Sequence, residues 1–485
     1  RALLQGVVAE SGDPAGARSR GHRASVAVLP FLNRSADAAD EYFSDGLADE
    51  MISVLSKIRG LHVAARTSAF QFKGKSDDLA VIARKLGVAT ILEGSVRKQG
   101  DRVRISARLV RASDGDQLWA ETFDRRLDDI FAVQDDIAQC VVQELRAALL
   151  PAADSEAETI RAEVAEAVRG RGRDAEAHRL YLQGRFFAVQ KTPEALTRGI
   201  EYLREAVGRD PEYALAWAEL GNAYADECYF GLRSNEEGYA RARDAVAHAL
   251  RLEPDLPSAH ARMARIQLLH DWDLVRAEAS FLRALDRDPN NATALHGAAV
   301  LLQATGRSDE AVTMNLRAIA VDPLSAATQN NLGCVYYESG QPVEAEAALR
   351  QALELSPTRY GTRAFLAQVL MEQGRGADAM AEAAREPDDV YRLLTLAIIH
   401  AREGRSAASD AAIAELTAKH GEECGLQVAE AHGACGHADA AFEWLEKSLA
   451  RRDPGLMHIQ PSPHFRSVRS DPRWPAFLKK LGLND

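Results

Sequence analysis

The stretch Leu295–Pro323, LHGAAVLLQATGRSDEAVTMNLRAIAVDP, is followed by a second stretch of the same design, Gln329–Pro357, QNNLGCVYYESGQPVEAEAALRQALELSP. Small or apolar residues, one glycine and a closing proline recur 34 positions apart in the two stretches. The step continues through Ala367, Gly374 and Ala379. Small residues suit places where two helices touch, and glycine and proline suit helix ends. The pattern therefore predicts repeated pairs of helices.

A helical hairpin with this period is the tetratricopeptide repeat. One such hairpin cannot bury its apolar face alone, so copies stack into a solenoid with a concave binding surface. Less regular copies of this 34-residue pattern extend the array over residues 175–450. The array then has about eight repeats, of which some are degenerate. This architecture favours recognition of a partner over catalysis.

Residues 25–150 are predicted to form an α/β domain with a mixed sheet and flanking helices. The apolar run Val26–Phe31 is typical of a buried strand. From Arg102 to Leu109, apolar residues alternate with arginine and serine, as in a half-buried strand. Further strands are expected near residues 61–65, 88–98 and 118–123, and helices are expected around residues 47–58, 77–86 and 130–148.

Two linkers and a terminal cap complete the predicted organisation. Residues 1–24 are rich in glycine, alanine, serine and arginine, and residues 151–174 are charged and rich in alanine. Residues 451–485 contain too many prolines for another repeat, so we expect them to cover the apolar face of the last helix pair. The chain begins at Arg1 without a signal-peptide pattern, which we interpret as a segment of a longer polypeptide.

Composition excludes several classes of protein. A formal net charge of -12 over 485 residues argues against direct binding of nucleic acid. The five cysteines are scattered, which favours free thiols over a disulfide framework. The longest apolar runs fall far short of the roughly 20 residues that a membrane span needs. The sequence does not fix the compartment, although we prefer a cytoplasmic location to a periplasmic one.

Catalytic and metal-binding patterns are not apparent. Gly74-Lys75-Ser76 resembles the end of a phosphate-binding loop, but position 69 is alanine where the loop needs glycine. A second candidate is a group of possible metal ligands near the C-terminus. It lacks the close, paired spacing that zinc ligands show. Its members are His420, Cys424, His432, Cys435 and His437. We therefore predict no cofactor, no metal and no catalytic residue in this chain.

Binding residues follow from the repeat geometry instead. The first helix of each repeat lines the concave side, so its polar residues outside the packing positions face a ligand. Amide and guanidinium groups suit the main chain and carboxylates of a peptide, although such residues can also be simply solvated. The residues selected in this way are Asn222, Arg262, Arg265, His296, Gln303, Asn330, Asn331, Tyr337 and Gln368.

A second candidate surface lies in the α/β domain. It is a basic stripe on one face of the sheet, made of Arg97, Lys98, Arg102, Arg104 and Arg108. Stripes of this kind are more often solvated than used for docking.

Residues 26–150 resemble the TolB-like amino-terminal domain that precedes tetratricopeptide arrays in bacterial regulatory proteins. The likeness is carried by VAVLPFLNRS from Val26, EYFSDGLADE from Glu41 and LGVATILEGSVRKQGDRVRISARLV from Leu86. In such proteins the upstream module is an adenylate or guanylate cyclase, a winged-helix DNA-binding domain or a protein kinase. The resemblance thus implies a sensory or regulatory half that binds a protein or peptide, with its output module elsewhere in a longer parent.

Two functions remain open at this stage. The first is a non-enzymatic signalling module that recruits a protein. The second is the regulatory part of a nucleotide cyclase whose catalytic domain is missing from this chain. Homo-oligomerisation is compatible with both.

Overall fold

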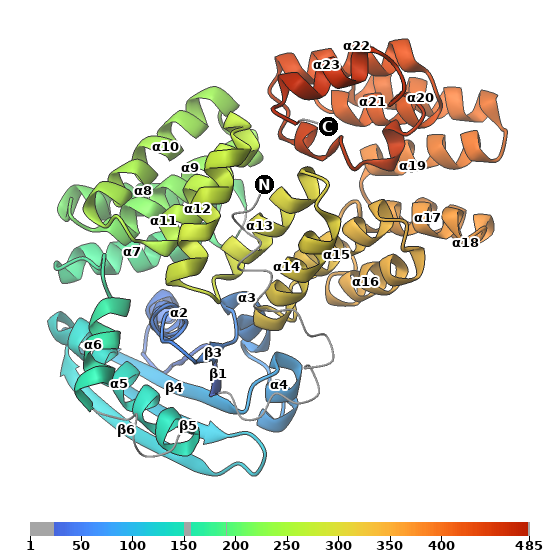
Figure 1. Ribbon diagram of the computed structural model, residues 1–485. Helices are drawn as coiled ribbons and strands as arrows, with labels where there is room; N and C mark the ends of the chain where they lie inside the picture. The colour runs from blue at the N-terminus through green and yellow to red at the C-terminus, as the bar shows by residue number, and fades with distance from the viewer. Residues whose placement is uncertain (1–23, 150–156, 191, 484–485) are drawn as a thin grey trace.

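In the computed structural model, which describes residues 24–149, 157–190 and 192–483, an α/β domain is followed by a helical solenoid (Figure 1). The predicted fold class is confirmed. The predicted linker 1–24 lies outside the described residues, except for Ala24.

The sheet combines a parallel half with an antiparallel half. Its strand order is β3-β1-β4-β5-β6, and β2 pairs with β4. β1 runs parallel to β3 and β4, whereas β4, β5 and β6 form an antiparallel meander. The strands are β1 (Ser25–Val28), β2 (Leu32–Asn33), β3 (His62–Val63), β4 (Thr90–Gln99), β5 (Arg102–Arg111) and β6 (Gln117–Arg126). The two-residue strand β2 was not predicted, because it is too short to show a period.

Helices cover the sheet on both faces in its parallel half. Val26 and Val28 of β1 share a core with α2 (Glu41–Leu55) and α5 (Ile130–Leu149), and Ala27 shares a second core with α4 (Leu79–Leu86). This follows from the strand geometry, since successive side chains point to opposite faces. A short helix, α3 (Arg66–Ala69), follows β3.

The described residues between 175 and 450 form eight helix pairs. Figure 1 shows them stacked in an arc above the α/β domain. The first four pairs are α7 (Ala175–Ala188) with α8 (Pro193–Arg209), α9 (Ala214–Tyr229) with α10 (Asn235–Leu252), α11 (Pro257–Ile266) with α12 (Leu274–Arg287), and α13 (Ala292–Ala304) with α14 (Ser308–Val321). The others are α15 (Ala326–Glu338) with α16 (Pro342–Leu355), α17 (Thr362–Glu372) with α18 (Gly376–Ala384), α19 (Asp389–Arg402) with α20 (Ser406–His420), and α21 (Gly425–Ala434) with α22 (Ala438–Ala450).

The repeated glycines and alanines have clear structural roles. Gly306, Gly340 and Gly374 adopt φ values of 69°, 73° and 74° in the turns inside their helix pairs, a conformation that other residues rarely adopt. Ala311 and Ala345 are fully buried where the second helix approaches the first. The 34-residue period therefore reflects turn geometry and close helix contact.

The charged segment before the solenoid is partly helical. Residues 157–167 form α6 (Ala157–Ala167), which buries Ile160 and Val164 in the core of the α/β domain. Residues 151–156 of the same predicted linker lie outside the described residues. α6 therefore adds a wall to the α/β domain next to the solenoid.

The C-terminal segment does more than cover the last helix pair. It comprises η6 (Pro454–His458), η7 (Pro463–Phe465) and α23 (Arg473–Lys480). Leu456, Met457 and Phe465 are fully buried and share one core with Leu295 and Leu302 of α13. In addition, Arg452 Nη1 donates to the carbonyl of His270 at 3.2 Å, in a π-helical turn, η5 (Gln267–Asp271), that follows α11. The segment thus reaches back to the third and fourth repeats.

Candidate functional site

The α/β domain docks along the turns that join successive repeats. Ser68 Oγ lies 2.5 Å from Asp322 Oδ1 and accepts the N–H of Leu324 at 2.9 Å. Gln71 donates to the carbonyl of Leu324 at 2.8 Å, and Asn290 donates to the carbonyl of Leu61 at 3.1 Å. These contacts fix the α/β domain against the third and fourth repeats.

A chain of ion pairs runs from the α/β domain into the solenoid. Asp49 of α2 binds Arg185 of α7 at 2.5 Å, and Arg185 lies 3.8 Å from Glu219 of α9. Glu219 in turn binds Arg262 of α11 at 2.5 Å. Asp49 and Glu219 are both buried, and Asp49 also binds Arg66 of α3 at 3.1 Å, so each carboxylate has more than one arginine close to it. Arg262, a predicted binding residue, is therefore connected to α2 through charges.

A second buried carboxylate, Glu50, lies next to this chain of ion pairs. Glu50 Oε2 lies 3.3 Å from His178 Nε2, and His178 Nδ1 lies 3.0 Å from the hydroxyl of Tyr213. Burial alone would raise the pKa of Glu50, but His178, Arg171 and Arg185 outweigh it and lower the pKa to about 2. Glu50 is therefore ionised at neutral pH and helps to hold α2 against α7.

Three of the predicted binding residues come together. Asn222, Arg262 and Arg265 line one small hollow with Tyr239 of α10. Arg265 Nη1 makes only a long contact with Asn222 Oδ1, at 3.5 Å. His296 lies close enough to Arg265 for their charges to interact, and burial together with Arg265 lowers its pKa to about 4. His296 is therefore neutral at physiological pH, and the hollow presents guanidinium and amide donors.

Three other predicted residues are buried. Gln303, Tyr337 and Gln368 are 4%, 3% and 2% exposed. Gln303 donates to Glu338 at 2.8 Å, and Gln368 Oε1 lies 2.7 Å from Nε2 of His464 in η7. The expectation that these three side chains face an open concave surface is wrong, because the C-terminal segment lies over this part of the solenoid.

The two asparagines of α15 have partners within the solenoid. Asn330 Oδ1 accepts from Thr362 at 2.8 Å, and Asn331 Nδ2 donates to Asn315 of α14 at 3.2 Å. Both side chains are partly buried. They contribute to packing between repeats, and a binding role for them stays a prediction.

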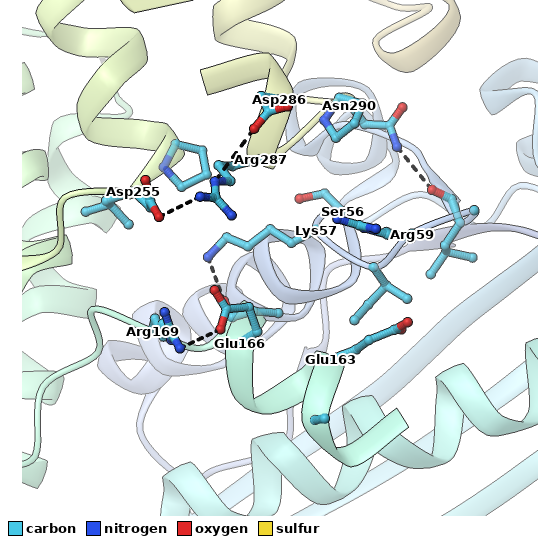
Figure 2. Close-up of a pocket in the computed structure, with 18 of the residues that line it drawn as sticks. Ser56, Lys57, Arg59, Glu163, Glu166, Arg169, Asp255, Asp286, Arg287 and Asn290 are labelled. Atoms are coloured by element: carbon cyan, nitrogen blue, oxygen red, sulfur yellow. Dashed lines mark hydrogen bonds and ion pairs between the residues drawn. The ribbon is translucent and has the colours of Figure 1, made fainter. Parts of the chain in front are cut away.

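A cavity of about 800 Å³ separates the α/β domain from the solenoid (Figure 2). One wall is the segment after α2, from Ser56 to His62, and a second wall is α6 with Arg169. The third wall consists of the turns after α10 and α12, with Asp255 and Asn290 among their residues. Sequence reasoning missed this cavity, because its walls come from three separate parts of the chain.

The basic stripe is largely neutralised. Arg102 and Arg104 both bind Asp124 at 2.6 Å, and Arg108 binds Glu93 at 2.7 Å. Lys98 does not belong to the stripe, because it binds Asp40 at 2.9 Å next to the start of α2. Three of the four arginines of the stripe are therefore paired with carboxylates, whereas the exposed Arg97 makes no ion pair with a described residue.

Among the histidines and cysteines near the C-terminus, Nδ1 of His432 lies 3.3 Å from Nδ1 of His437, whereas two other members have partners outside the group. His420 lies 3.0 Å from Asp389, and Cys435 lies 3.3 Å from Ser409. Over residues 24–149, 157–190 and 192–483, no group of three or more His, Cys, Asp or Glu could hold a metal ion. In the same parts of the chain, no helix is both long and apolar enough to cross a membrane.

Comparison with known families supports the presence of tetratricopeptide repeats. Models of the tetratricopeptide repeat match residues 296–360 and 336–385, so the chain contains tetratricopeptide repeats as predicted. A model of the second domain of HilA/YgeH-like transcriptional regulators matches residues 22–140. The resemblance to a TolB-like domain is not confirmed, because this other family model matches the region.

Two named proteins are similar to parts of the chain. "Putative adenylate cyclase 3" of Rhizobium meliloti (strain 1021) is 39% identical over 196 residues, which cover 40% of this chain and 32% of that protein. "Cellulose synthase operon protein C" of Xanthomonas axonopodis pv. citri (strain 306) is 30% identical over 152 residues, which cover 30% of this chain and 9% of that protein. The matched part thus spans about a third and about a tenth of their lengths.

Solved structures are similar to parts of the chain at low identity. PilF of Pseudomonas aeruginosa is 19% identical and matches 43% of this chain and 91% of that chain, with a TM-score of 0.36. The human IFIT1 dimer with PPP-AAAA is 15% identical and matches 66% of this chain and 88% of that chain, with a TM-score of 0.39.

Proposed function

We propose that this chain is a non-enzymatic regulatory module that binds a protein or peptide on the concave side of its second and third repeats. Tetratricopeptide repeats form an interaction fold, which supports a protein partner. The hollow around Asn222, Arg262 and Arg265 offers donors to main-chain carbonyls and carboxylates. The corresponding side of the fifth and sixth repeats is covered by the C-terminal segment.

The observation that carries this proposal is the chain of ion pairs from Arg262 to Asp49. A partner's acceptor group in the hollow would compete with Glu219 for Arg262. Loss of that ion pair would let Glu219 interact more strongly with Arg185, which also binds Asp49 of α2. Binding of a partner on the solenoid would in this way change the contacts of the α/β domain, and through it affect an output module of a longer parent.

The test uses a variant that spares this chain of charges. In Asn222→Ala/Arg265→Ala, two partly exposed side chains are removed, and each carries at most a weak contact. We expect melting to change little, since such substitutions usually shift stability by about 0.5 kcal/mol or less. The partner is captured from a lysate of the source cell, identified, and titrated against both proteins. We expect weaker binding by the variant.

The matched control is Arg276→Ala/Arg283→Ala, which removes two exposed arginines from the outer helix α12. The control should bind the partner as the parent does. Equal affinities of the parent and the Asn222→Ala/Arg265→Ala variant would place the site elsewhere.

A second candidate function is the regulatory part of an adenylate or guanylate cyclase. The similarity to a protein named as an adenylate cyclase favours it, although the match covers 32% of that protein. The match to a domain of transcriptional regulators instead favours an output module that acts in transcription rather than a cyclase. The gene sequence on either side of this chain distinguishes the two.

A further inference from the structure

The cavity between the α/β domain and the solenoid contains a buried amine. Lys57 follows α2, and in Figure 2 its side chain extends across the cavity toward α6. Its ammonium group donates to the carbonyl of Ala167 at 2.6 Å. An ammonium has three donors, and Lys57 has no ion-pair partner within 4.0 Å in the described residues. Two of its donors are therefore available to a ligand.

The carboxylates of the cavity are divided into paired and unpaired groups. Glu163 binds Arg146 at 2.5 Å, Glu166 binds Arg169 at 2.8 Å, and Asp255 binds Arg287 at 2.7 Å. Glu253 also lines the cavity, and it makes no ion pair with any described residue. The cavity thus holds an amine and a carboxylate that make no ion pair within 4.0 Å with a described residue, although Asp288, Glu253 and Glu166 are near enough to Lys57 for their charges to interact with it.

Apolar residues also line the cavity. They are Leu61, Leu256, Pro257 and Pro289, which come from the α/β domain and from the two inter-repeat turns. A cavity of about 800 Å³ with apolar walls and a few convergent polar groups is typical of a small-molecule site. Burial lowers the pKa of Lys57 to about 8, which agrees with an amine that water solvates poorly.

We propose that this cavity binds a small zwitterion with an apolar body, of the class of the hydrophobic amino acids. Its carboxylate accepts from Lys57, its ammonium group faces Glu253, and its apolar part lies against the leucines and prolines. Because the walls belong to both domains, the ligand bridges the α/β domain and the solenoid. This site is separate from the concave surface, so it gives the module a small-molecule input in addition to a protein partner.

The experiment is isothermal titration of the full chain with three probes that share a phenyl ring. L-phenylalanine carries both charges, phenylacetate lacks the ammonium group, and phenethylamine lacks the carboxylate. We expect L-phenylalanine to bind at least about tenfold more tightly than either of the others, since each charged hydrogen bond contributes roughly 1.5–3 kcal/mol. No binding of L-phenylalanine, or equal binding of all three probes, would overturn the proposal.

Variants locate the site. Lys57→Met should weaken the binding of L-phenylalanine and leave the affinity for phenethylamine unchanged. Glu253→Gln should weaken the binding of L-phenylalanine and leave the affinity for phenylacetate unchanged. Lys75→Met removes an exposed lysine outside the cavity and serves as the control. If Lys57→Met and Lys75→Met bind L-phenylalanine equally well, the ligand does not contact Lys57 and the assignment is wrong.

Discussion

At the scale of single residues, the interior of this chain contains several carboxyl groups with altered acidity. Glu338 at the end of α15 is partly buried beneath the C-terminal segment and accepts from Gln303. Burial, together with the nearby Glu430, raises the pKa of Glu338 to about 8, although the hydrogen bond from Gln303 opposes the rise. Glu338 is therefore a protonated acid over much of the physiological range.

Replacement of Glu338 by glutamine should stabilise the protein at alkaline pH. The folded state binds the proton of Glu338 more tightly than the unfolded state, so stability falls as pH rises from about 4.5 to about 8. Glutamine cannot ionise and still accepts from Gln303. We expect the variant to gain several kcal/mol over the parent above about pH 8, and little below about pH 5.

Denaturant unfolding of both proteins across this range measures the difference. Glu354→Gln on α16 is the control, because Glu354 is exposed. A stability difference between parent and Glu338→Gln that does not vary with pH would contradict the raised pKa.

At the scale of helices, the solenoid depends on close contact within each pair. Ala311 and Ala345 occupy equivalent positions at the start of α14 and α16, and neither is exposed to solvent. A side chain larger than alanine cannot be accommodated there without movement of one helix.

Ala345→Leu should therefore destabilise the array. Overpacking of a tight core typically costs about 1–3 kcal/mol. Val343→Leu, at a position of α16 that is 70% exposed, is the matched control and should have little effect. Thermal unfolding measures both, and hydrogen exchange in α14 and α17 should rise as well, because repeats stabilise their neighbours. A variant that melts like the parent would show that the contact is not tight.

At the scale of the whole molecule, the α/β domain and the solenoid are joined by hydrogen bonds at the inter-repeat turns. Asp322 is buried there, and burial raises its pKa, although the hydroxyl of Ser68 opposes this effect. The docking of the two domains thus combines these polar contacts with an apolar core that α2 shares with α7.

Ser68→Ala should loosen this interface. Loss of the hydroxyl leaves the carboxyl of Asp322 and the N–H of Leu324 without this partner, a cost of about 1–3 kcal/mol. Hydrogen exchange at the amide of Leu324 should become faster, whereas Ser106→Ala on the exposed sheet face should leave it unchanged. Unchanged exchange in Ser68→Ala would mean that the domains are held by other contacts.

The sequence by itself determined the helical repeats and the main strands, because both depend on local periodicity. The 34-residue step located Ala311, Ala345 and the turn glycines, and the alternation in β5 located its buried face. Very short elements such as β2 and α3 were not predicted, because they contain too few residues to show a period.

Only the tertiary structure decided which concave residues are accessible. Gln303 and Gln368 satisfy the repeat pattern as well as Arg265 does, yet the C-terminal segment covers them and leaves Arg265 partly exposed. The cavity around Lys57 likewise depends on parts of the chain about 100 to 230 residues apart. Local periodicity carries no information on such pairings, because they are set by how whole domains pack against each other.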